Sequence, residues 1–152
     1  VAVEAMRLLK AAGEKVRWYV LGEGPERVRL ERQIAASGLQ EDFLLMGETD
    51  NPYPYYAQTD IYVHATGYEG KSIAVQEAQT LGCAIVVSES SREQVRDGVD
   101  GTVCALEPEA VCRAVRELIR EPQKRAAYGH AAEARRIDCE EQKKLLEELL
   151  WK

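Results

Sequence analysis

The fold is decided by one stretch of the sequence, Ile61-Tyr62-Val63-His64-Ala65-Thr66-Gly67-Tyr68-Glu69-Gly70-Lys71-Ser72-Ile73-Ala74-Val75-Gln76-Glu77-Ala78. Its first six residues form an apolar run, which is typical of a buried parallel strand. A turn and a helix follow the strand. In open α/β sheets ligands bind at the carboxyl ends of the strands, so this turn is where we expect a ligand.

Two glutamates mark this turn and its helix. Glu69 lies in the turn, and Glu77 lies about two helical turns further along the chain. An ionised glutamate only accepts hydrogen bonds, so the pair suits a ligand rich in hydroxyl groups, such as a sugar at one end and a ribose at the other. The alternative is that both are solvated surface charges, as most charged residues are.

The rest of the chain repeats the alternation of strand and helix. Strands are predicted at residues 16–21, 43–46, 61–65, 83–87 and 102–106, the last as a short edge strand. Helices are predicted up to Gly13, from Pro25 to residue 37, after Asn51-Pro52, and from Pro108, Pro122 and Asp138. This order predicts an α/β fold: a doubly wound, mostly parallel, Rossmann-like sheet with helices on both faces.

The beginning of the chain departs from this order. Residues 1–12 have a helical pattern, whereas a doubly wound domain normally starts with a strand. We therefore expect residues 1–152 to be one domain, truncated at its N-terminus, whose first strand is missing. No interdomain linker or internal repeat is visible.

Composition narrows the function classes. The 152 residues suffice for one domain with a core, and the net charge of -6 argues against a nucleic-acid binder. No apolar run reaches the roughly 18 residues of a membrane span, and no signal peptide is visible. The four cysteines lack C-x-x-C spacing, which predicts no zinc site and free thiols in a reducing, cytoplasmic environment.

Two glycine-containing turns are candidate ligand contacts. Gly22 and Gly24 allow backbone to approach a ligand, although Arg27 replaces the third glycine of the dinucleotide fingerprint. An ordinary tight turn explains them equally well. The second turn, Gly70-Lys71-Ser72, precedes a helix, where free N–H groups and the helix dipole favour a diphosphate.

Aromatic residues and histidine are assigned to packing. His64 near a strand end is expected to be a packed histidine with satisfied hydrogen bonds rather than a base. Tyr53, Tyr55 and Tyr56 are expected to pack the core at a helix start, although they could stack on a nucleotide base.

Several blocks of the sequence occur in the order found in one family. They are Val20 to Pro25, Leu45-Met46-Gly47, Asn51 to Tyr55, Asp60 to Val63, Tyr68 to Ala78 with its Glu-Gly-(six residues)-Glu-Ala core, and Glu93 to Gly98 with Gly101. The chain resembles the C-terminal, donor-binding domain of the group 1 retaining glycosyltransferases of GT-B architecture, over residues 1 to about 120.

The resemblance implies a site for a nucleotide-diphosphate sugar. It implies that Glu69 contacts hydroxyls of the donor sugar, as our candidate catalytic residue, and that Glu77 holds the ribose. The other implied donor-binding residues are Gly22, Gly24, Met46, Gly47, Gly70, Lys71 and Ser72, with Met46 and Gly47 bordering the base pocket. Such enzymes retain the anomeric configuration and need no metal or other cofactor, because basic side chains neutralise the diphosphate.

The sequence also departs from the family pattern. The family's arginine and lysine lie before the position of Val1, the N-terminal acceptor domain is absent, and residues 88–92 lack paired glycines. We expect the parent enzyme to transfer a sugar to a glycan or lipid-linked acceptor in polysaccharide biosynthesis, with peripheral membrane association, and this chain alone to be inactive. The alternatives are a nucleotide-sugar epimerase or phosphorylase of the same architecture, or a non-catalytic interaction module.

Overall fold

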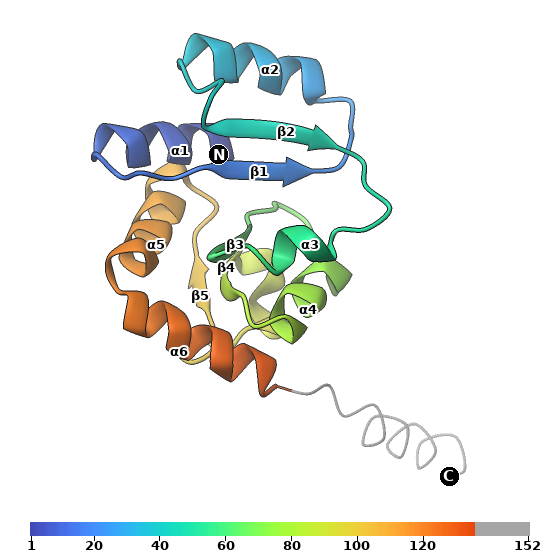
Figure 1. The fold of residues 1–152 in the computed structure, drawn as a ribbon, viewed down its shortest axis with the longest axis vertical. Coiled ribbons are helices and arrows are strands. Elements are labelled where there is room, and N and C mark those ends of the chain that lie inside the picture. The colour runs from blue at the N-terminus through green and yellow to red at the C-terminus, as the bar shows by residue number, and fades with distance from the viewer. Residues whose placement is uncertain (136–152) are drawn as a thin grey trace.

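A computed structural model describes residues 1–135 of the chain, and Figure 1 shows its helices and strands. Their order is α1 (Ala2–Ala11), β1 (Trp18–Leu21), α2 (Arg27–Ala36), β2 (Phe43–Gly47), α3 (Tyr53–Tyr56), β3 (Ile61–His64), α4 (Ile73–Thr80), β4 (Ala84–Ser88), the 3₁₀ helix η1 (Glu89–Gln94), β5 (Thr102–Cys104), α5 (Pro108–Arg120) and α6 (Pro122–Glu133). The helix predicted from Asp138 lies outside the described residues.

All strand pairs in the described part are parallel, as predicted. The strands form two sheets, however, in the orders β1-β2 and β3-β4-β5. Trp18 pairs with Phe43 in the first sheet, and Val63 pairs with Val86 in the second. In the described part, β1 and β3 do not pair with each other.

The central strand β4 shows why helices cover both faces of its sheet. Successive side chains of a strand point to opposite faces. Ala84 and Val86 pack into the core formed with α1 and α5, whereas Ile85 and Val87 pack into a second core with α4. All four are buried, which confirms the predicted α/β layering.

The sheet β1-β2 has its own core. Val3 and Met6 of α1 and Ile34 of α2 pack against Phe43, and the Trp18 ring stacks on Phe43 with centroids 5.7 Å apart. The helices α1 and α2 therefore lie on this sheet, as Figure 1 shows at the top of the molecule.

Two local predictions differ from the structure. Pro25 does not start α2, because Pro25 and Glu26 form a turn whose Arg27 N–H donates to the Gly24 carbonyl at 3.1 Å. No helix was predicted for residues 88–92, but residues 89–92 lie in the 3₁₀ helix η1.

The segment Asp97-Gly98-Val99-Asp100-Gly101 holds the edge strand β5 in place. The Asp97 carboxylate accepts a hydrogen bond from the Val103 N–H at 2.8 Å, and the fully buried Asp100 pairs with Arg96. A Cβ on Gly101 would lie 2.8 Å from the Ile85 carbonyl oxygen, so only glycine allows this approach. The contacts of this segment are therefore structural, because they position the predicted edge strand β5 against β4.

Other predictions concern cysteines and membrane segments. Cys83, Cys104 and Cys112 are free thiols, and burial raises the pKa of Cys83 to about 11. Cys139 lies outside the described residues. Within residues 1–135, no helix combines the length and the apolar character that a membrane crossing requires.

Candidate functional site

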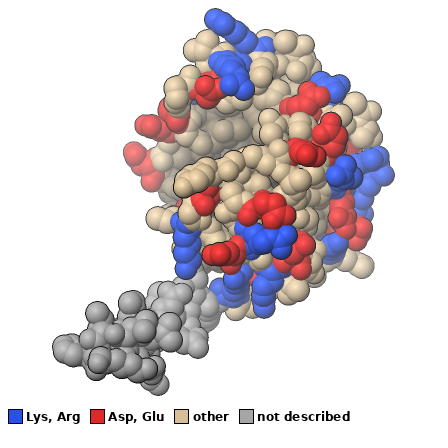
Figure 2. Space-filling view, turned by 180° about the vertical axis from the view of Figure 1, so that it is seen from behind, with Lys and Arg blue, Asp and Glu red and all other residues tan. Residues whose placement is uncertain are grey.

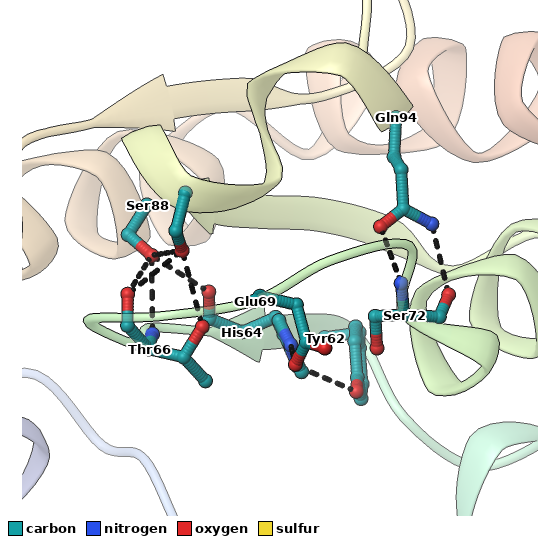
Figure 3. Close-up of polar contacts among 8 residues, drawn as sticks. Tyr62, His64, Thr66, Glu69, Ser72, Ser88 and Gln94 are labelled. Carbon is teal, nitrogen blue, oxygen red and sulfur yellow. Dashed lines mark hydrogen bonds and ion pairs between the residues drawn. The ribbon is translucent and has the colours of Figure 1, made fainter.

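The turn between β3 and α4 is anchored at its start by buried Ser88. The Thr66 N–H donates to Ser88 Oγ at 3.1 Å, and this hydroxyl donates to the Thr66 carbonyl at 2.6 Å. Ser90 Oγ also donates to the Thr66 carbonyl, at 2.9 Å. The Ser88 hydroxyl, on the left of Figure 3, and that of Ser90 hold the end of β3 against the end of β4.

Gln94 anchors the other end of the turn. Its Oε1 accepts from the Ser72 N–H at 2.7 Å, and its Nε2 donates to the Ser72 carbonyl at 2.8 Å (Figure 3). Ser72 is buried, and a buried amide needs a partner, so the expectation of a free N–H at Ser72 is wrong. Gly70 and Lys71 lie exposed at the surface.

Glu69 is held by a histidine. Its Oε2 lies 3.0 Å from His64 Nε2, and His64 Nδ1 lies 3.2 Å from the Tyr62 hydroxyl. An ionised carboxylate only accepts, so His64 Nε2–H donates to Glu69. Burial raises the pKa of Tyr62, so its hydroxyl stays protonated and shares one hydrogen bond with Nδ1. His64 is packed and satisfied, as predicted.

Glu77 is held by two tyrosines. The Tyr53 hydroxyl donates to Oε1 at 3.1 Å, and the Tyr56 hydroxyl donates to Oε2 at 3.4 Å. The hydrogen bond to Glu77 raises the pKa of Tyr53, whereas burial is the main cause that raises the pKa of Tyr56. Tyr56 packs in the core beside α4 as predicted, whereas Tyr53 is 52% exposed and does not. The contacts of both tyrosines with Glu77 were not foreseen.

The two glutamates are thus tied to neighbouring aromatic residues. The rings of Tyr56 and Tyr62 meet edge to face with centroids 5.6 Å apart. Among residues 1–135, no lysine or arginine forms an ion pair with Glu69 or Glu77. Both carboxylates are therefore oriented by uncharged donors and keep capacity to accept further hydrogen bonds.

The predicted residues of the other sheet gather at the carboxyl ends of β1 and β2. The Gly22 N–H donates to the Gly47 carbonyl at 2.7 Å, and both glycines have positive φ, 114° and 77°. Met46 is 42% exposed, and Gly24 lies exposed in the loop before α2. The backbone in this region is thus open to a ligand.

One cavity of about 720 Å³ lies beside neighbours of both regions, although none of the predicted donor-binding residues lines it. Leu21 of β1 lines one side, while His64 and Tyr56, the partners of Glu69 and Glu77, line the other. Its lining contains no lysine, arginine, aspartate or glutamate, and Figure 2 shows a hollow without acidic or basic colour below the top of the molecule. The volume suits a small-molecule ligand.

No cluster of three potential metal ligands occurs within residues 1–135.

The chain is similar in sequence to known glycosyltransferases. The family model of group 1 glycosyl transferases matches residues 1–135. A GDP-mannose-dependent alpha-(1-6)-phosphatidylinositol dimannoside mannosyltransferase of Mycobacterium tuberculosis is 31% identical over 81% of this chain and 32% of its own length. An N-acetylgalactosamine-N,N'-diacetylbacillosaminyl-diphospho-undecaprenol 4-alpha-N-acetylgalactosaminyltransferase of Campylobacter jejuni is 28% identical over 79% of this chain and 34% of its own length. The chain spans about a third of each relative.

Solved structures show the same fold. HepE of Anabaena, crystallised with UDP, matches with a TM-score of 0.84 and 21% identity over 98% of this chain and 44% of its own. TarM of S. aureus matches with a TM-score of 0.88 and 19% identity over 98% of this chain and 31% of its own. These likenesses confirm the predicted GT-B type of fold. The chain belongs to the group 1 glycosyltransferases.

Proposed function

We propose that this chain is the donor-binding domain of a retaining glycosyltransferase, and that the whole protein moves a sugar from a nucleotide-diphosphate sugar to a glycan or lipid-linked acceptor. The observation that carries the proposal is the pair Glu69 and Glu77: two oriented carboxylates without basic partners among the described residues, next to an uncharged cavity. Membership in the glycosyltransferase family supports a sugar donor as the ligand of these carboxylates.

Names of similar proteins support the classes of donor and acceptor. The two curated relatives are named for transfer to a diphospho-undecaprenol-linked and to a phosphatidylinositol-linked acceptor. HepE was crystallised with UDP and with UDP-glucose. We infer a nucleotide-diphosphate hexose as donor, and a reaction in polysaccharide or glycolipid synthesis on the cytoplasmic side of a membrane.

The two glutamates take different parts of the donor. Glu77 accepts hydrogen bonds from the ribose hydroxyls, because Tyr53 and Tyr56 fix both of its oxygens from one side. Glu69 accepts from hydroxyls of the sugar, because it lies in the turn, 30% exposed, and only its Oε2 is engaged by His64. In this role Glu69 is the candidate catalytic residue.

The diphosphate is placed at the N-terminus of α4. Gly70 and Lys71 precede the helix and supply backbone N–H groups where the dipole favours an anion. The Ser72 N–H does not take part, because it donates to Gln94. We place the base beside Met46 and Gly47. We propose that basic side chains, rather than a metal, neutralise the leaving diphosphate.

Donor binding can be tested on the chain by NMR. The ¹⁵N-labelled protein is titrated with UDP, GDP, UDP-glucose and GDP-mannose. We expect chemical-shift changes at residues 69–77 with the uridine ligands or with the guanosine ligands, but not with both. The control is Glu41→Gln, since Glu41 is exposed at the amino end of β2. A folded spectrum in which no ligand perturbs residues 69–77 would contradict the proposal.

Transfer itself is tested on the whole protein. Incubated with donor and lipid-linked acceptor, it is expected to release nucleoside diphosphate only when the acceptor is present. An epimerase would alter the donor without acceptor, and an interaction module would leave both unchanged. Either result would replace the proposed function.

A further inference from the structure

Gln94 joins the 3₁₀ helix η1 to the turn that precedes α4. Its Oε1 accepts from the Ser72 N–H at 2.7 Å, and its Nε2 donates to the Ser72 carbonyl at 2.8 Å (Figure 3). One side-chain amide thus pairs with both backbone groups of one residue. Gln94 is 7% and Ser72 is 6% exposed, so both contacts are shielded from water. Because buried polar groups without partners are costly, this pairing fixes Ser72 relative to η1.

Ser72 is the residue from which α4 starts. It is the N-cap of the helix, and its own side chain makes no capping hydrogen bond. Its carbonyl also accepts from the Gln76 N–H, but at 3.4 Å, which is long for such a bond. The shorter contact to this carbonyl comes from Gln94. The start of α4 is therefore held by a side chain from outside the helix.

The backbone of Gln94 is itself held from two sides. Its carbonyl accepts from Gln79 Nε2 at 2.7 Å and from the guanidinium of Arg135, which follows α6. Arg135 also lies 3.6 Å from the fully buried Asp100 carboxylate. Gln94 is thus tied to α4, to the end of α6 and, through Arg135, to the segment before β5. A side chain with such a fixed base can define the position of a turn.

Ser72 adjoins the residues to which the proposed function assigns the diphosphate. Exposed Gly70 and Lys71 directly precede it. Ser72 is therefore the fixed point, on the helix side, from which these two residues project. Gln94 is buried, so it acts on a ligand through Ser72 rather than by contact.

The proposed ribose contact is held independently of this pairing. Glu77 accepts from two tyrosines of α3 rather than from η1. The fully buried side chains of Val75 and Ala78 pack α4 into its core. The helix and its carboxylate should therefore keep their place when the contact between Gln94 and Ser72 is lost, whereas the turn before the helix should not.

We propose that Gln94 is a positioning residue for the diphosphate of the donor. Through Ser72 it holds the backbone N–H groups of Gly70 and Lys71 where the phosphates meet them, and correct placement of such groups is what makes them effective. This inference rests on the proposed function. It adds a buried residue, outside the reach of the donor, on which the affinity for the phosphates depends.

The test compares two methionine variants by NMR titration. Gln94→Met keeps the length of the side chain but removes both contacts with Ser72. Gln79→Met is the matched control, because it also removes a buried amide hydrogen bond, of 2.7 Å. In this control Ser72 stays paired, and Arg135 still donates to the Gln94 carbonyl.

Each protein is titrated with a nucleoside diphosphate and with the nucleoside alone, UDP and uridine or GDP and guanosine. The measurement is the dissociation constant of the diphosphate divided by that of the nucleoside. We expect Gln94→Met to raise this ratio about five- to tenfold and Gln79→Met to change it less than about twofold. General destabilisation would weaken both ligands and leave the ratio unchanged.

Hydrogen exchange at the Ser72 amide tests the contact itself, without any nucleotide. We expect exchange at least about tenfold faster in Gln94→Met than in Gln79→Met, because only the first variant removes the acceptor of this N–H. Equal exchange in the two variants would overturn the contact and the proposal with it.

The titrations separate two kinds of failure. If the parent binds the diphosphate and both variants give the parent's ratio, the positioning role of Gln94 is wrong while the proposed function stands. If the parent binds neither diphosphate, the proposed function fails and the role of Gln94 fails with it. If Gln94→Met does not fold, Gln94→Asn, which is one methylene shorter, is measured in the same way, and an unchanged ratio there overturns the proposal too.

Discussion

Glu69 and Glu77 are held in the site by contacts of different range and burial. Glu69 is bound by His64, five residues before it, which in turn is bound by Tyr62. Glu77 is bound by Tyr53 and Tyr56, which lie 24 and 21 residues before it on another helix. The first carboxylate is oriented by the strand that leads into the turn, and the second by packing between two helices.

This difference separates their expected roles. Glu77 has both oxygens fixed, within a helix, so it offers a rigid acceptor pair for two adjacent hydroxyls of a ribose. Glu69 has one oxygen fixed, in a turn whose ends are anchored by Ser88 and Gln94. It is suited to contacts that change during a reaction.

The largest effect is expected for Glu77→Gln. Glutamine keeps the shape but loses the charge and one acceptor oxygen, and a hydrogen bond to a charged group contributes about 1.5–3 kcal/mol. Affinity for the preferred nucleoside diphosphate should fall roughly 10- to 100-fold by calorimetric titration. Glu41→Gln should leave it unchanged. Equal affinities of Glu77→Gln and the parent would remove Glu77 from the ribose site.

A smaller and more selective effect is expected for Glu69→Gln. This variant should bind the nucleoside diphosphate normally, but the nucleotide-sugar about three- to tenfold more weakly, consistent with one lost hydrogen bond of roughly 1 kcal/mol. The ratio of the two dissociation constants is the measurement. If both ligands weakened equally, the assignment of sugar and ribose to separate glutamates would fail.

Much of this site could be predicted from the sequence because it depends on local patterns. The apolar run at residues 61–66, the turn and the helix with Glu77 all fall close to the expected positions. His64 lies near the end of a strand, so its packing was also foreseen, whereas its contact with Glu69 was not. Local chain order was sufficient for these features.

Contacts between distant segments could not be predicted in this way. Nothing in the pattern around Gln94 indicates that its amide pairs with Ser72, 22 residues earlier, because the contact depends on how η1 packs against α4. The tyrosine contacts of Glu77 depend likewise on the packing of α3. The division of the sheet between β1 and β3 also depends on three-dimensional pairing, which strand patterns do not specify.

His64→Phe tests whether the histidine orients Glu69. Phenylalanine keeps a flat ring but removes both nitrogens, so Glu69 loses its donor and the Tyr62 hydroxyl loses its hydrogen-bond partner. We expect the nucleotide-sugar to bind about two- to threefold more weakly, from a lost contribution below about 1 kcal/mol, with unchanged nucleoside diphosphate affinity. His64→Gln should restore part of the difference. Loss of affinity for both ligands would indicate general disruption of the turn.

The smallest effect concerns alkaline pH and separates the two tyrosine environments. Burial raises the pKa of Tyr62 in the folded chain above the value of about 10 expected in the unfolded chain. Between these values the unfolded chain releases a proton that the folded chain keeps, so this stabilisation is complete below about pH 10 and is lost as the pH rises.

Tyr62→Phe should therefore reduce the loss of stability above about pH 10, measured as urea midpoints over a series of pH values. Tyr53→Phe should change this slope far less, because Tyr53 is 52% exposed and solvent screens its contact with Glu77. Equal slopes in the two variants would mean that Tyr62 is not isolated from water. The contacts around Glu69 would then be as accessible to water as the tyrosine contacts of Glu77. The two glutamates would differ only in how far along the chain their partners lie.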